Sequence, residues 1–192
     1  MPLAGTWNHV RLQDCAASPW RNGGGLTHEL VSQPAEEWFW RVSVARIDRN
    51  GPFSSYPGVR RQFAVLRGAG VHLVIDGQDH VLTPGSPAVA FDGDQPCRCE
   101  LIDGPTLDFN LMTRGGQARL QRWRTHDSLP WTAGHIAGVY ACAPASVRHD
   151  SGELWQLQED ELLWSADLRP GLWGLEASQA WVFGVEVPAQ WA

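Results

Sequence analysis

Short polar side chains recur at every second position in three separate stretches of the chain, each alternating with apolar residues. Because successive side chains of a β-strand point to opposite faces, each stretch would form a strand with one polar face. The polar residues are Thr27 and Glu29, Arg41 and Ser43, and Asp108 and Asn110. Side chains of this kind could line a pocket for a small polar molecule. Alternatively, they could face water, as one side of an antiparallel sheet commonly does.

The two carboxylates of this set would need cationic partners if they were enclosed, because an unpaired buried charge is strongly destabilising. Every cationic residue of the chain is an arginine, which excludes lysine-based Schiff-base chemistry. Arginine forks bind carboxylates through two parallel hydrogen bonds. The arginines in or beside these stretches are Arg21, Arg41, Arg46 and Arg114. Together with Asn22, they predict a binding site for a small carboxylate metabolite.

Three consecutive glycines at positions 23–25 follow Trp20, Arg21 and Asn22 and lead into an alternating segment at 26–30. A phosphate-binding glycine loop needs a helix N-terminus behind it, whereas this alternation predicts a strand. We therefore expect the glycines to supply positive φ angles or close backbone approach where a strand enters a sheet. On this pattern alone, a purely structural turn is the simpler alternative.

The spacing of histidines and cysteines predicts neither a metal site nor a cofactor. A type I′ hairpin turn at residues 76–77 would place His72 and His80 on opposite faces of a sheet, so they would not chelate one ion. Cys97 and Cys99 would share one strand face, but no second pair completes a tetrahedral zinc site, and we expect reduced thiols. No Gly-x-Ser-x-Gly nucleophile motif is present. A metal site assembled from distant residues remains an alternative.

Charge and hydropathy argue against two classes of partner. The formal net charge is −6 and no basic run is longer than Arg60-Arg61, so we expect no nucleic-acid partner. No apolar stretch approaches the roughly 18 residues of a membrane span. The N-terminus lacks the cationic and apolar blocks of a signal peptide, and we expect a cytoplasmic protein without a membrane partner.

The elements that must position the polar residues are short strands. Apolar or alternating runs follow one another with turn signals between them, which predicts an all-β sandwich or barrel. A polar segment at 115–124 is expected to link two halves. The predicted strands lie at 38–47, 63–66, 71–75, 78–82, 88–91, 98–102, 107–112, 136–142, 154–157, 162–168 and 181–187.

Four segments resemble the HutD/Ves family of bacterial cupin-like proteins, in order and spacing, over roughly residues 5–125. They are the stretch from Trp20 to Leu30, the strand at 40–47, the turn at 51–58 and the strand at 108–114. The resemblance implies a cupin-like jelly roll with two β-rolls (a bicupin) in one compact unit spanning residues 1–192. The N-terminal half would cover about 5–115, and a degenerate second β-roll about 125–192.

Cupin enzymes usually hold a metal with a His-x-His pair, a later Glu and a further His. This chain departs from that pattern, with His72 alone on the first motif and Cys97 where the last His is expected. The resemblance further implies a role alongside histidine utilisation. We therefore favour a non-catalytic carboxylate-binding cupin that acts as a regulator or governor, with N-formylglutamate or urocanate as candidate ligands.

Two enzyme hypotheses remain as alternatives. One is a metal-dependent cupin isomerase or dioxygenase, and the other is a metal-free acid/base enzyme that uses Glu29 or Asp108. A further expectation concerns assembly, because pairing through a sheet edge or β-roll would give a homodimer.

Overall fold

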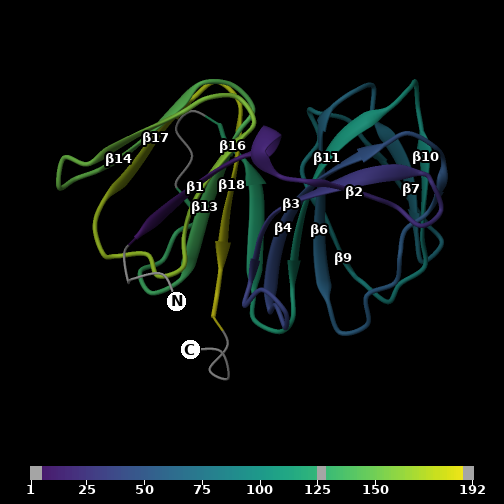
Figure 1. Ribbon diagram of the computed structural model, residues 1–192, viewed down its shortest axis with the longest axis horizontal. Coiled ribbons are helices and arrows are strands. Elements are labelled where there is room, and N and C mark those ends of the chain that lie inside the picture. Colours follow the sequence, from purple (N-terminus) through teal and green to yellow (C-terminus); the bar gives the residue numbers. More distant parts are fainter. Residues whose placement is uncertain (1–5, 125–128, 188–192) are drawn as a thin grey trace. The chain divides into compact units, whose positions relative to one another are not determined.

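The computed structural model describes residues 6–124 and 129–187, and its elements are β-strands apart from one short 3-10 turn at Leu12–Asp14. The chain divides into two compact units, shown in Figure 1. The central unit is Cys15–Gly115, and the terminal unit is formed by the described residues on either side of it. No helix in the described ranges is long and apolar enough to cross a membrane.

Two antiparallel sheets form the central unit. Its core lies between them, where Phe63 and Val65 of one sheet pack with Val71 and Leu73 of the other. The six-stranded sheet has the order β2 (Ala17–Pro19), β3 (Gly25–Gln33), β4 (Trp40–Ile47), β11 (Thr106–Thr113), β6 (Arg60–Arg67) and β9 (Val89–Asp92). The four-stranded sheet has the order β5 (Gly51–Pro52), β10 (Cys97–Leu101), β7 (Val71–Ile75) and β8 (Gln78–Leu82).

The hairpin predicted at residues 76–77 is confirmed. Asp76 and Gly77 have φ angles of 48° and 78°, the left-handed values that a type I′ turn requires. In the resulting register, His72 is opposite Val81 and His80 is opposite Leu73. The two histidines therefore point to opposite faces of the sheet, as expected.

The terminal unit also contains two antiparallel sheets. Its core includes a cluster of four half-buried indoles, in which the ring of Trp7 lies 5.1–5.6 Å from those of Trp131, Trp155 and Trp173. The five-stranded sheet has the order β1 (Trp7–Arg11), β16 (Glu161–Ser165), β13 (Ile136–Ala141), β18 (Ala180–Val185) and β12 (Ala118–Arg122). The three-stranded sheet has the order β15 (Leu154–Leu157), β14 (Ala145–His149) and β17 (Trp173–Ala177).

The sequence predicts halves at about 5–115 and 125–192 within one unit, whereas contacts group residues 15–115 in one unit and the described residues on either side in the other. The predicted linker at 115–124 is wrong, because β12 lies there and pairs with β18, burying Leu120. The N-terminal strand β1 belongs to the terminal unit, where it pairs with β16. Glu161 stabilises this pairing by contacting His9 at 2.8 Å and Arg11 at 3.1 Å. A local pattern contains no information on such a distant partner.

Candidate functional site

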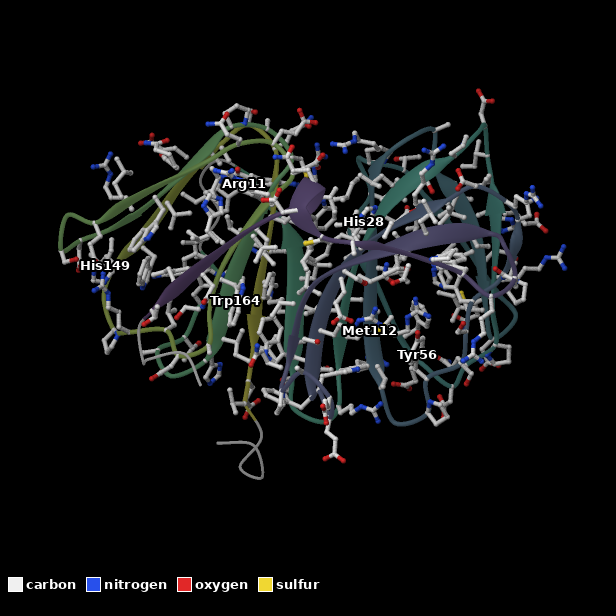
Figure 2. The ribbon with its side chains drawn as sticks, in the orientation of Figure 1. Arg11, His28, Tyr56, Met112, His149 and Trp164 are labelled. Atoms are coloured by element: carbon white, nitrogen blue, oxygen red, sulfur yellow. The ribbon has the colours of Figure 1, made fainter. Side chains whose placement is uncertain are left out.

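The central unit contains a cavity of about 700 Å³. Met112 and Tyr56, both on its lining, are labelled in Figure 2. The other lining residues are Ser18, Pro19, Trp20, Arg21, Asn22, Thr27, Arg41, Ser43, Ala45, Ile47, Pro52, Phe53, Ser54, Ser55, Arg61, Phe63 and Asn110. The lining thus includes three arginines and no Asp, Glu, His or Cys.

The strand register brings four of the six predicted strand-face residues, Thr27, Arg41, Ser43 and Asn110, to this cavity. Ser43 on β4 is opposite Asn110 on β11. Two positions along, Met112 lies between Arg41 on β4 and Arg61 on β6. Because neighbouring strands are about 4.8 Å apart, the backbones at the two arginines are separated by roughly 10 Å. A small molecule in the cavity can therefore reach both guanidinium groups.

The glycine-rich turn at residues 20–25 positions the lining residues Trp20, Arg21 and Asn22. Gly23 has a φ of 67°, and its N–H donates to the carbonyl of Trp20 at 3.0 Å. Asn22 Oδ1 accepts from the N–H of Gly24 at 2.9 Å. A Cβ on Gly25 would lie 2.2 Å from the carbonyl oxygen of Arg46, so only glycine fits there. Both expected uses of the glycines, positive φ and close backbone approach, are confirmed.

Arg61 is a cavity residue that the sequence analysis missed. Its side chain is buried, and Nη2 donates to Oδ1 of Asn110 at 3.0 Å. The guanidinium carbon lies 5.0 Å from the ring centres of both Phe53 and Phe91 and 5.8 Å from that of Tyr56. Burial lowers the pKa of Arg61 to about 10, so it stays charged at neutral pH. No carboxylate within the described ranges pairs with it.

The sequence contains an alternating pattern that places Arg61 on the buried face of a strand. The predicted strand began at residue 63, whereas β6 begins at Arg60. Arg61 therefore alternates in phase with Phe63 and Val65, which point into the core. Arg60 points the other way and pairs with Asp92 at 2.9 Å. An arginine in phase with a buried strand face was the available clue to a functional cation.

Four of the predicted site residues are outside the cavity lining. Arg46 projects from the other face of β4, where its Nε lies 2.8 Å from Oδ1 of Asp48. Arg114 follows β11 and stacks over the ring of Trp38 at 4.7 Å. The remaining two are Glu29, whose Oε2 lies 2.6 Å from Nε of the lining residue Arg41, and Asp108.

Asp108 is fully buried among the core residues of the central unit. Its Oδ2 accepts a hydrogen bond from the hydroxyl of Thr106 at 2.7 Å, while Oδ1 has no hydrogen-bond partner. Burial raises the pKa of Asp108 to about 8, so the carboxyl group is mostly protonated at neutral pH. The sequence predicts an arginine partner for an enclosed Asp108, whereas in the described ranges its carboxyl group accepts a hydrogen bond from Thr106 alone. The raised pKa favours the neutral form of this buried group.

We expect this proton to make stability depend on pH. The pKa of Asp108 is raised from 3.8 to about 8 in the folded protein, so between these values the unfolded chain releases the proton and the folded chain keeps it. Stability should then fall with rising pH, by up to about tenfold in the unfolding equilibrium constant per pH unit. Urea unfolding of Asp108→Asn should show a flatter profile across this window. Equal slopes in both proteins would contradict the assignment.

A family comparison agrees with this architecture. The HutD family model matches residues 12–180, which is most of the chain. The chain belongs to the HutD family. The HutD resemblance stated from the four sequence segments is thereby confirmed.

Curated relatives of this HutD-family protein include members described as Ves. Protein Ves of Cronobacter sakazakii is 38% identical over 164 residues, covering 83% of this chain and 82% of that protein. A Pseudomonas putida protein described as an uncharacterized 21.2 kDa protein in the hutC 3′ region is 38% identical over 117 residues. That match covers 58% of this chain and 62% of the relative, less than two thirds of its length.

Solved structures share the whole fold. A conserved protein of unknown function from Pseudomonas aeruginosa PAO1 matches with a TM-score of 0.84 and 32% identity, over 95% of this chain and 98% of that one. HutD from Pseudomonas fluorescens SBW25 matches with a TM-score of 0.79 and 30% identity, over 94% and 98%. At 9% identity, Ylba from Escherichia coli has a TM-score of 0.69 over 97% of this chain and 93% of that one, which shows the fold alone. The fold of this HutD-family protein is cupin-like and all-β, and within residues 6–124 and 129–187 its sheets do not close into a barrel.

The residues of this HutD cavity do not fit the metal that cupin enzymes hold. Nitrogen, oxygen or thiolate ligands would have to come from His, Asp, Glu or Cys, and the lining has none of these. Elsewhere in the described ranges, no three such side chains are grouped to hold a metal ion. The cavity instead offers guanidinium, amide, hydroxyl and aromatic groups, which suit an organic anion.

Proposed function

We propose that this HutD-family protein binds a small carboxylate in the central-unit cavity without converting it, and that binding serves regulation of histidine utilisation. The observation that carries the proposal is the charge of the lining. It contains Arg21, Arg41 and Arg61 and no acidic side chain, in a chain of net charge −6. Such a local excess of positive charge favours an anionic ligand.

The contacts of Arg61 support a carboxylate at the inner end of the site. Asn110 occupies one guanidinium nitrogen, and Nε is buried without a hydrogen-bond partner. A carboxylate could accept from the remaining donors as a bidentate pair. Ser43, Thr27 and Asn22 offer hydroxyl and amide groups that could recognise a formyl or amide group. N-formylglutamate carries two carboxylates and a formamide, and urocanate carries one carboxylate and an imidazole. We retain both as candidate ligands.

The cavity also favours binding over catalysis. A general acid or base must lie within hydrogen-bond reach of the reacting group, and the lining contains no His, Asp, Glu, Lys or Cys, which leaves Tyr56 as its one side chain of that kind. Glu29 is engaged by Ser32 and Arg41, and Asp108 lies outside the lining in the core. The histidine-utilisation context rests on the HutD family name and on the relative described in the hutC 3′ region.

Calorimetry tests the proposal directly. N-formylglutamate, glutamate, urocanate and histidine would be titrated into the protein, and the samples would then be checked by NMR for conversion. We expect at least one carboxylate to bind below millimolar concentration and to be recovered unchanged. At 100 times its dissociation constant, it should stabilise the protein by about 2.7 kcal/mol.

Arg21→Ala should weaken this binding by roughly tenfold, since a charge-assisted hydrogen bond contributes about 1.5 to 3 kcal/mol. The exposed Arg119→Ala on β12 serves as the matched control and should leave binding unchanged. No binding by any member of the series, or chemical conversion of the ligand that binds, would refute the proposal.

A further inference from the structure

The strand β3 contains a bulge beside the cavity. Its pairing with β4 shifts register between Glu29 and Val31, which leaves Leu30 as an extra residue. Before the bulge, Glu29 is opposite Ser43, and after it Ser32 is opposite Arg41. Ser43 and Arg41 both line the cavity, so Glu29 and Ser32 lie on the same face of β3 although they are three residues apart. In a regular strand they would point to opposite faces.

The bulge thereby builds a chain of polar contacts that ends at the cavity. The hydroxyl of Ser32 donates to Oε1 of Glu29 at 2.7 Å, and Oε2 lies 2.6 Å from Nε of Arg41. The second contact is an ion pair without aligned hydrogen-bond geometry. Glu29 is about half-exposed at the edge of the site, whereas Arg41 is only 16% exposed. Glu29 therefore compensates the charge of Arg41 from outside and leaves the Nη groups available to a ligand.

Arg41 on β4 and Arg61 on β6 therefore differ in whether a nearby carboxylate compensates their charge. Arg61 has no carboxylate partner in the described ranges, while Arg41 has Glu29 beside it. A carboxylate gains most from the uncompensated cation. At Arg41, a second carboxylate would be repelled by Glu29, whereas a neutral carbonyl oxygen can accept from the guanidinium without that repulsion. Two guanidinium groups can thus bind two different groups of one ligand, a carboxylate at Arg61 and a neutral carbonyl oxygen at Arg41.

We infer that Glu29 is a specificity-determining and positioning residue, which makes the Arg41 end of the cavity select a neutral carbonyl group while Arg61 binds the carboxylate. The inference rests on the proposed carboxylate-binding function and deepens it. The preferred ligand places a carboxylate at Arg61 and an amide or acyl oxygen at Arg41. N-formylglutamate can meet this condition through its formyl oxygen, whereas urocanate has no carbonyl group outside its carboxylate. A ligand of the same length that presents a carboxylate to each arginine is the disfavoured competitor.

The test compares two matched probes, glutarate and glutaramate, which differ only in whether the second terminus is a carboxylate or a primary amide. Wild-type protein should bind glutaramate more tightly. Glu29→Gln leaves the charge of Arg41 without its carboxylate partner. The ratio of the two dissociation constants should therefore shift by about tenfold in favour of glutarate. Ser32→Ala leaves Glu29 in place but removes its hydrogen bond, so it should cause a smaller shift in the same direction. This second variant keeps the test open if Glu29→Gln fails to fold.

Glu176→Gln provides the control, because it removes one exposed carboxylate from β17 of the terminal unit and should leave the ratio unchanged. A merely structural role for Glu29 would weaken both probes equally. That result, or an unchanged ratio in both variants, would overturn the inference while leaving carboxylate binding intact. If neither probe binds the wild-type protein, the proposed carboxylate-binding function fails, and the inference fails with it.

Discussion

Arg61→Met is expected to weaken carboxylate binding by about 100-fold, the loss of two charge-assisted hydrogen bonds at the lower end of their usual range. Arg61 is the buried cation of the cavity, and its Nη2 donates a hydrogen bond to the neutral amide of Asn110. Methionine is apolar and long enough to keep contact with Phe53 and Phe91. The change therefore removes the anion-binding group while largely preserving the packing around it.

The same variant should remain stably folded. Burial of a charge without a carboxylate partner is unfavourable, and removing it offsets the loss of the hydrogen bond to Asn110. We expect the free energy of unfolding to change by no more than about 1 kcal/mol. Calorimetry and thermal melting would measure the two effects separately. Arg60→Met is the matched control, because Arg60 is the adjacent residue in the chain and its exposed side chain pairs with Asp92. Retained binding in Arg61→Met, or a large fall in its melting temperature, would contradict the role assigned to Arg61.

Gly25→Ala is expected to destabilise the central unit by about 3 kcal/mol, a large effect for a single added methyl group. The new Cβ would lie 2.2 Å from the carbonyl oxygen of Arg46, so the ends of β3 and β4 would have to separate. Gly24 O accepts from the N–H groups of Asp48 and Arg49 at this point, and those bonds would be strained as well. Because the same turn carries Arg21 and Asn22, ligand binding should also weaken.

Gly85→Ala is the control within the same unit, because the nearest atom to its added Cβ is 3.7 Å away. Urea unfolding followed by tryptophan fluorescence would compare the two variants. A midpoint for Gly25→Ala close to that of Gly85→Ala would show that the strand ends can relax around the added group. It would also remove the structural reason for the third glycine of the turn.

Much of the central unit was predictable because its signals are local. The alternation at 71–75 and 78–82, with the Asp76 and Gly77 turn between them, predicted β7, β8 and their register. The alternating polar residues predicted which side chains share a strand face. The arrangement of those faces on one cavity follows from the order β3-β4-β11-β6, which no local pattern specifies. The terminal unit was less predictable, since β1 and β12 find partners far away in the chain.

The sequence by itself determined the family, the β-strand class and six of the polar residues that line the cavity, because these depend on residue type and on spacing within single segments. Only the tertiary structure decided the burial and the contacts of Asp108, Arg61 and Glu29. Burial raises the pKa of Asp108 to about 8, and Arg61 faces the cavity because it lies two residues before Phe63 on β6 and alternates in phase with it. Glu29 reaches Arg41 through the β3 bulge. Burial and strand register set these interactions, and both arise only when distant segments pack together.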